Sequence, residues 1–450
     1  MVKKVVLIIV AFVFFFFSGE GYAGEKLRHL SLKECLEMAK ENNLFVKEAE
    51  EKIFEAEKEL LEAKGRFLPV LNAGVSFTRL DREMSPGMGG LIQNLLDEIP
   101  GIELPESEYE TYTGRDMYSV TGRLRIPLFT GFRNRAVLRN AEIGVEIELE
   151  NYRKVVNDLY LDVKETFYRV LLTQKIIELN RESELRLEKH LNQTRTLYEN
   201  GLASRLDLLR SEIQLSNLRS EITRIKNNLR AAKASLLLLM GLKSEDIYID
   251  AKGDLQYTEV RIDLESSVKN ALENRPEAVM LRMQKKAAGE GITIARSGGL
   301  PQVHAAYNRS LEYPHDMQDK WGSNWNFMIN IDLPVFRGFS THSDTARARS
   351  RKKQLEYGID RLEDGIRLEV ENSYYEIINE KENIRALEKN IIQAEEALSI
   401  AQRQYRNGII TGLEFRDTEL SYMQAHLNLL RAQADYLIAV SRHKHATGGK

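Results

Sequence analysis

Four segments of the chain alternate strictly between apolar side chains and polar or small ones. These segments are residues 71–80, 118–126, 302–308 and 324–333. Successive side chains of a β-strand point to opposite faces, so each segment predicts a strand with one apolar face and one polar face. Aromatic residues that suit a membrane interface stand in or near these segments, namely Tyr118, Tyr313, Trp321 and Trp325. This pattern is typical of transmembrane β-strands, although a half-buried strand of a soluble sheet alternates in the same way.

The number of strands indicates that more than one copy of the chain is needed. Four strands cannot close a barrel, and each unpaired backbone group at an open sheet edge costs several kcal/mol in lipid. Three copies of four strands would supply twelve, which lies inside the range of known barrels, whereas two copies would leave little room for a channel. We therefore expect a transmembrane β-sheet that is completed in a homotrimer.

A helical period follows the first pair of strands. Apolar residues recur every three or four positions from Leu138 to Val170, the spacing of one face of a long α-helix. This helix should begin after Phe132 and end at Tyr198, and its length of about 65 residues corresponds to ~100 Å. Such a helix exceeds the size of a globular domain, so we expect it to cross open space.

Shorter helices flank the strands and the long helix. Residues 32–64 predict a helix that begins at the N-cap Ser31, with Glu34 completing a capping box. The pair Asn42-Asn43 is expected to interrupt this helix. Residues 204–240 predict a returning helix, which a following glycine closes.

The chain contains two related halves. The turn Tyr198-Glu-Asn-Gly-Leu returns as Tyr405-Arg-Asn-Gly-Ile, displaced by 207 residues. The junction Pro-x-Phe-x-Gly-Phe occurs at residues 127–132 and, at the same displacement, at residues 334–339. One register kept over so long a span indicates an internal repeat.

The repeat predicts the organisation of the domains. We expect a first structural repeat over residues 24–242 and a second over residues 264–450, joined by a linker at residues 243–263 that contains a small strand. The first repeat carries additional residues in its strand loop, residues 80–117, which are rich in glycine, proline and acids. That composition predicts a long surface loop with a short helix at residues 91–96.

The beginning of the chain predicts export. Lys3 and Lys4 precede an apolar run at residues 5–17, and small residues allow cleavage before Gly24, so residues 1–23 predict a signal peptide. The run is short for a membrane-spanning helix. A retained anchor helix is the alternative interpretation.

Composition and motifs argue against several classes of function. The 64 basic and 67 acidic residues are interspersed and give a formal net charge of −3, which argues against a nucleic-acid partner. No phosphate-binding glycine loop and no hydrolase or metalloprotease motif is found, so we expect no enzyme, cofactor or bound metal. His443 and His445 have the spacing of metal ligands but lack further partners. Cys35, the single cysteine, is expected to be a packed core thiol.

The repeat, the two junctions and the turn Tyr198-Glu-Asn-Gly-Leu-Ala-Ser-Arg-Leu-Asp207 together resemble the TolC-type outer-membrane efflux protein family. The resemblance covers essentially the whole mature chain. It implies a mainly α fold with transmembrane β-strands, in which a homotrimer forms a twelve-stranded β-barrel in the outer membrane and an α-helical tunnel in the periplasm.

The family also implies a passive exit duct for drugs, toxic compounds or secreted polypeptides, in tripartite efflux or type I secretion. Its partners would be a periplasmic adaptor and an inner-membrane pump of the RND or ABC type. An exported coiled-coil filament is the alternative; it would explain the helices but not the four alternating strands.

The resemblance assigns a docking surface to the two turns. The positions that would meet the adaptor are Gly201, Leu202, Ser204, Leu206, Gly408, Ile409, Thr411 and Leu413. The alternative is that these residues only cap helices and supply the hydrophobic contact that accompanies such caps.

The resemblance also assigns a gate. Asp207, Glu414 and Asp417 would line the periplasmic constriction, and Tyr405 would hold it closed through a bond to Asp207. An arginine that strengthens this closure in the family falls here on Ile410, so that link is missing. Either Arg205 substitutes for it, or closure is weaker than in relatives.

Glu414 and Asp417 lie three residues apart and can share a helical face. A threefold ring of these carboxylates would raise their pKa values, prefer cations and be blocked by multivalent cations. The alternative is that both acids are solvated and favoured only by the helix dipole.

Overall fold

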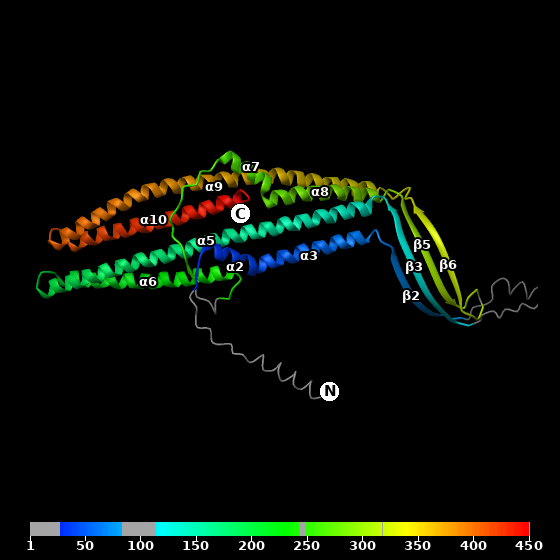
Figure 1. Cartoon of the computed structure of the whole chain (residues 1–450), viewed down its shortest axis with the longest axis horizontal. Coiled ribbons are helices and arrows are strands. Elements are labelled where there is room, and N and C mark those ends of the chain that lie inside the picture. The colour runs from blue at the N-terminus through cyan, green and yellow to red at the C-terminus, as the bar shows by residue number, and fades with distance from the viewer. Residues whose placement is uncertain (1–27, 83–113, 244–248, 317, 450) are drawn as a thin grey trace, which may run out of the picture. The chain divides into compact units, whose positions relative to one another are not determined.

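The computed structural model describes residues 28–82, 114–243, 249–316 and 318–449. The predicted signal peptide and the predicted helix at residues 91–96 lie outside these residues. The small strand predicted in the linker is present as β4 (Ile249–Ala251). The chain divides into two compact units. We call residues 1–51, 150–279 and 361–450 the hairpin unit, and residues 52–149 and 280–360 the sheet unit. Figure 1 labels the elements along the chain.

The sheet unit contains the four strands that the alternation predicts. They are β2 (Val70–Arg79), β3 (Asp116–Thr130), β5 (Gln302–Tyr313) and β6 (Gly322–Asp332). They form one antiparallel sheet in the order β2-β3-β5-β6. The register places apolar side chains beside apolar ones, for example Val75 opposite Val120 and Phe77 opposite Tyr118. The sheet therefore has one apolar and one polar face, as predicted.

The polar face is held by side-chain hydrogen bonds across the strands. Arg123 Nε donates to Asn308 Oδ1 over 3.0 Å, and Asn308 Nδ2 donates to Asn326 Oδ1 over 2.8 Å. The Oγ atoms of Ser76 and Ser119 lie 3.1 Å apart. These side-chain contacts link β2 to β3, β3 to β5 and β5 to β6 on the face opposite the aromatic residues.

The two Pro-x-Phe-x-Gly-Phe junctions turn the chain from a strand into a long helix. Gly131 and Phe132 have φ values of +59° and +67°, and Gly338 and Phe339 repeat them with +54° and +62°. A side chain at residue 131 would come within 2.9 Å of Leu300 Cβ, so both backbone conformation and space require glycine there. The repeated motif thus encodes a repeated bend.

The helices have the same lengths in both halves of the chain. They are α2 (Leu32–Asn42), α3 (Leu44–Gly65), α5 (Arg133–Glu199), α6 (Arg205–Leu239), α7 (Leu264–Asn274), α8 (Pro276–Ser297), α9 (Ser340–Arg406) and α10 (Gly412–Ala446). The first four have 11, 22, 67 and 35 residues, and the last four have the same lengths in the same order. The predicted interruption of the first helix is confirmed at Asn43, and so is the capping box of Ser31 and Glu34.

Among the residues that the structure describes, no helix has both the length and the apolar character needed to cross a membrane.

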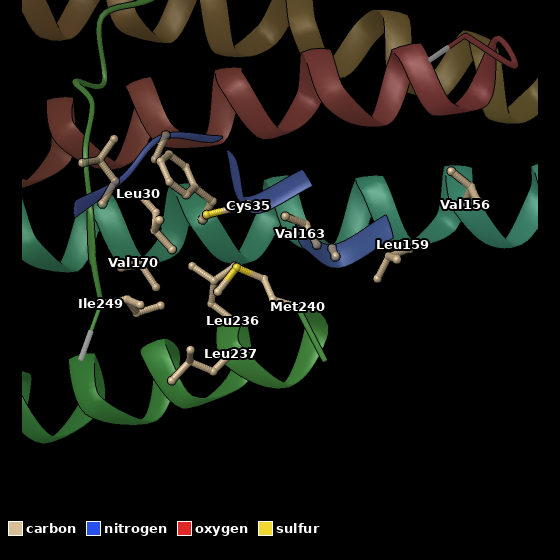
Figure 2. Packing of buried hydrophobic residues seen from close by; sticks show 14 of the residues in the cluster. Leu30, Cys35, Val156, Leu159, Val163, Val170, Leu236, Leu237, Met240 and Ile249 are labelled. Atoms are coloured by element: carbon tan, nitrogen blue, oxygen red, sulfur yellow. The ribbon is translucent and has the colours of Figure 1, made fainter. Parts of the chain in front are cut away.

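The largest core lies in the hairpin unit, where helix α5 meets α2, α6 and the small parallel sheet of β1 (Arg28–Leu30) and β4 (Ile249–Ala251). The C-terminal half of the predicted apolar stripe packs in this core, and its residues Val156, Leu159, Val163, Phe167 and Val170 are all buried. Figure 2 shows Cys35 between Leu30, Val163 and Leu236 in this cluster. Cys35 is fully buried, as predicted, and burial raises the pKa of its thiol to about 11. The thiol therefore stays protonated and unreactive at neutral pH.

A buried ion pair joins the first helical hairpin, α5 with α6, to the second, α9 with α10. Arg186 Nε of α5 donates to Glu419 Oε1 of α10 over 3.3 Å, and the guanidinium carbon of Arg186 lies 5.3 Å from the ring centre of Tyr422. The side chain of Glu419 is only 3% exposed, and that of Arg186 is 26% exposed. Burial raises the pKa of Glu419, and the charge of Arg186 opposes that rise. The pair thus fixes α10 against α5 at a high cost in desolvation.

Breaking this pair should loosen the contact between the hairpins. Glu419→Ala leaves the charge of Arg186 largely buried without its acid, a loss of about 3 kcal/mol for a buried pair. Amide hydrogens of α10 around residue 419 should then exchange on the order of 100-fold faster by mass spectrometry. The double variant Arg186→Met, Glu419→Leu should exchange nearly as slowly as the wild type, because apolar side chains of similar size replace both charges.

The repeat supplies a matched control for this prediction. Glu212 is the equivalent of Glu419 in the first half, but its side chain is 43% exposed and pairs with Arg195 over 3.4 Å. Glu212→Ala should therefore change exchange by no more than about fivefold, as expected for a surface ion pair. Equal effects of Glu212→Ala and Glu419→Ala would show that the buried pair does not hold the hairpins together.

Candidate functional site

The turn between α5 and α6 contains the first half of the candidate site. Gly201 has a φ of +74° and donates from its backbone N–H to Tyr198 O over 2.9 Å, while Leu202 N donates to Leu197 O over 2.8 Å. This pair of bonds ends α5 in a Schellman motif, which explains the glycine. Ser204 then caps α6, with Asp207 as the acid of a capping box. Two adjacent caps leave only a few residues between the antiparallel helices.

The turn between α9 and α10 has the same construction. Gly408 has a φ of +70° and its N–H donates to Tyr405 O over 3.0 Å, while Ile409 N donates to Gln404 O over 2.9 Å. Thr411 caps α10, and its N–H donates to Glu414 Oε2 over 2.8 Å. The two turns therefore present the same backbone surface.

The eight predicted docking residues all lie at these two turns. Four of them are large apolar side chains that face solvent in the single chain: Leu202, Ile409, Leu206 and Leu413 are 76%, 68%, 54% and 50% exposed. Gly201 and Gly408 are exposed too, and a side chain at either would meet no atom within 4 Å. Ser204 and Thr411 cap α6 and α10, but capping does not account for the exposed leucines and isoleucine.

The predicted gate acids are exposed and hold the caps in the single chain. Asp207 Oδ2 accepts hydrogen bonds from the backbone N–H and the hydroxyl of Ser204 over 3.2 and 2.6 Å. Hydrogen bonds from the backbone N–H and the hydroxyl of Thr411 lower the pKa of Glu414. A lowered pKa means that the carboxylate persists to lower pH, and the stability it gives the cap is lost as pH falls through that value. Asp417 faces solvent beside Arg416, whose Nη2 lies 3.2 Å from its carboxylate.

Tyr405 packs into an aromatic cluster between the two hairpins. Its ring stacks on Phe415 with centroids 5.2 Å apart and lies 5.1 Å from the ring of His190. The structure thus gives Tyr405 and Asp207 other partners within one chain, and the predicted bond between them stays a prediction. Ile410, at the position of the missing arginine, packs against this cluster as well.

Arg186, His190 and Glu419 also belong to this region and were not predicted from the sequence. His190 packs against the rings of both Tyr405 and Phe415, and burial lowers its pKa, so the ring is neutral at neutral pH. The repeat did not indicate that Glu419 is buried, because its equivalent Glu212 is the same residue type and is exposed. The equivalent of Arg186 in the second half is Gln393, which cannot form an ion pair. This difference between the halves is the one signal in the sequence that could have indicated the pair.

The two histidines near the C-terminus contact residues of the surrounding helices. His443 is buried, with Ser373 Oγ 2.9 Å from its Nδ1 and Ser267 Oγ 3.3 Å from its Nε2. His445 Nε2 lies 2.7 Å from Asp158 Oδ1. No group of three or more metal-ligating side chains occurs in the described parts of the chain.

Comparisons with known proteins identify the family. The outer membrane efflux protein family matches residues 35–242 and 267–449. The outer membrane protein TolC of Vibrio cholerae is 22% identical over 307 residues, which cover 66% of this chain and 69% of that protein. The alkaline protease secretion protein AprF of Pseudomonas aeruginosa is 23% identical over 344 residues, which cover 74% of this chain and 70% of that protein.

A solved structure supports the same fold. The CmeC outer membrane channel of Campylobacter jejuni superposes with a TM-score of 0.78 at 14% identity, covering 93% of this chain and 85% of that one. These matches confirm the resemblance to TolC-type proteins and favour a channel over an exported filament. The family consists of membrane channels and is not a family of enzymes. The chain therefore belongs to the outer membrane efflux protein family, whose members lie in the outer membrane and extend into the periplasm.

Proposed function

We propose that this protein is the passive exit duct of a tripartite efflux or type I secretion system. Three copies close a twelve-stranded barrel in the outer membrane and place their helical hairpins around a common tunnel in the periplasm. The observation that carries the proposal is a four-stranded sheet with one apolar face in a chain of this family. Among the described residues, β2 and β6 each pair on one side only, so the outer edges of the sheet are available to other copies.

The equal element lengths support two structural repeats, residues 24–242 and 264–450, after a signal peptide at residues 1–23 and around a linker at residues 243–263. Four helices of the first half have the same lengths as their counterparts in the second. Two similar halves in three chains give six similar hairpins around the tunnel. Such pseudo-sixfold packing suits a closed ring of helices, because each interface can reuse nearly the same surface.

The partners follow from the proposed place in the cell envelope. A periplasmic adaptor would connect the duct to an inner-membrane pump of the RND or ABC type. The name of the Pseudomonas relative assigns secretion of a protease to that protein, and efflux of small compounds is equally compatible with a passive duct. The pump that co-purifies with this chain would decide between the two cargo classes.

The exposed turns are proposed as the docking surface for the adaptor. Gly201, Leu202, Ser204 and Leu206 lie at one turn, and Gly408, Ile409, Thr411 and Leu413 lie at the other. Each turn exposes two large apolar side chains beside its glycine, which is typical of a surface that binds another protein.

Gly201→Asp should abolish docking while leaving the fold intact. Aspartate tolerates the left-handed conformation better than most residues, and the site has open space, but the new carboxylate places a charge among apolar contacts. Docking can be measured by cross-linking the adaptor through a Leu202→Cys thiol, since Cys35 is buried and protonated. The control Gly201→Asn has nearly the same size without the charge and should retain most of the cross-linking. Unchanged cross-linking in Gly201→Asp would place the docking surface elsewhere.

Glu414, Asp417, Asp207 and Tyr405 are proposed as the gate. In a threefold assembly, Glu414 and Asp417 bring six carboxylates into one ring, which attracts cations and repels anions. The cap at Thr411 lowers the pKa of Glu414, which favours the charged carboxylate at this position. Tyr405 and Asp207 lie at the two turns and would hold the closed state.

Single-channel recording tests the gate. The double variant Glu414→Gln, Asp417→Asn removes the charges and keeps a side chain that can complete the capping box. It should lose cation preference and block by divalent cations while remaining a trimer. The control Glu34→Gln changes a capping-box acid of the same kind on α2 and should keep both properties. Selectivity and block that survive the double substitution would mean that these acids do not line the constriction.

A further inference from the structure

Besides the ion pair of Arg79 and Asp116 at the strand ends, the apolar face of the sheet carries Arg309, within a row of small and aromatic side chains. The register pairs Ala73 with Gly122, Gly122 with Arg309, and Arg309 with Trp325. Along β5, Arg309 alternates in phase with Tyr307 and Leu311, the apolar side chains, and out of phase with Asn308 of the polar row. The guanidinium of Arg309 therefore belongs to the face that the proposed function places against lipid.

The surroundings of Arg309 leave it exposed and leave space beside it. Its side chain is exposed, and none of the hydrogen bonds or ion pairs found among the described residues involves it. On one side, Gly122 and Ala73 have little or no side chain, and a Cβ at residue 122 would meet only Arg309 O at 3.9 Å. On the other side stands Trp325, which is 70% exposed. The row thus leaves open space beside Arg309 on the side of Gly122 and has the exposed indole of Trp325 on the other side.

Aromatic residues give the depth of Arg309 in the membrane. Phe77, Tyr118, Tyr313 and Trp321 cluster at the end of the sheet near the β5–β6 loop, with ring centroids 5.0 to 6.1 Å apart. Phe129 and Phe132 mark the opposite end, with centroids 5.2 Å apart. Such girdles flank an apolar band of about 25 Å in barrels of this kind. Arg309 lies four residues from Tyr313, which corresponds to ~10 Å below the outer girdle for a tilted strand.

An arginine at this depth is unfavourable unless an anion compensates it. Charged residues on the lipid face cost about 2–4 kcal/mol at the midplane and less towards the interface. The side chain can reach towards the headgroups on the side of the β5–β6 loop. Strand β5 has β3 and β6 of its own chain as neighbours, so a second copy that joins at β2 or β6 does not cover Arg309. A lipid of that leaflet remains as the partner that can approach.

We propose that Arg309, with the open space over Gly122 and Ala73 and the indole of Trp325, binds the phosphate-bearing headgroup of a lipid in the outer leaflet. Guanidinium and phosphate form charge-assisted, bidentate hydrogen bonds, and these are strong where water is scarce. The indole can supply one further donor, and an acyl chain can lie over the small side chains between the flanking apolar rows. The inference rests on the proposed function, because it requires this face to lie in the membrane.

Native mass spectrometry of the full-length protein in mild detergent tests the site, with dioleoyl phosphatidic acid as the phosphomonoester probe and phosphatidylcholine as the zwitterionic comparison. The wild type should prefer phosphatidic acid, and Arg309→Leu should weaken that binding at least about tenfold. Arg309→Lys should retain part of the preference, because it keeps the charge but loses the bidentate geometry. Arg123→Leu, on the polar face of the neighbouring strand, should bind as the wild type does.

Flotation with lipid vesicles separates the two ways in which the inference can fail. Equal binding of phosphatidic acid by the wild type and Arg309→Leu, in a protein that still floats with vesicles, would overturn the lipid site and leave the proposed function intact. Loss of binding in Arg123→Leu to the same degree as in Arg309→Leu would overturn the site as well. A wild-type protein that does not float would overturn the proposed function, and the lipid site with it.

Discussion

The unpaired edges of the four-stranded sheet impose the strongest constraint on this molecule. Strands β2 and β6 each use one side of their backbone for pairing within the chain, and lipid offers no hydrogen-bond partner for the other side. An apolar face and open edges are compatible in a membrane only if other copies of the chain supply the missing strands. Under the proposed function, closure of the sheet comes from assembly, and everything that the chain presents beyond the sheet has to be compatible with a ring.

The helices meet this requirement through repetition. Each half of the chain uses the same junction with two residues at positive φ, a helix of 67 residues, a glycine-ended turn and a returning helix of 35 residues. The two hairpins differ near the turns, where the buried pair of Arg186 and Glu419 and the cluster of His190, Tyr405 and Phe415 join one hairpin to the other. Because these contacts desolvate charged and polar groups, they hold one arrangement without adding much net stability.

Periodicity in the sequence was sufficient to predict elements but not their partners. The strands followed from alternation at Val75 and Val120, the long helix from the stripe through Val163, and the buried thiol from the apolar neighbours of Cys35. The burial of Glu419 could not be predicted, since Glu212 has the same place in the repeat and remains exposed. Arg309 lies just beyond the strand predicted at residues 302–308. Its place on the apolar face follows from its inclusion in β5 and from the register of β5 with β3 and β6.

The central claim is that three chains complete one sheet, and the mass of the particle extracted from outer membranes in mild detergent tests it most directly. Native mass spectrometry should give three times the mass of the mature chain, and circular dichroism of the same particle should show the β content of four strands per chain. Denaturation should release monomers that lose this β content, because the edge strands no longer have partners. A monomer that keeps the full β content in detergent would contradict the account, since the sheet would then be stable with its edges open.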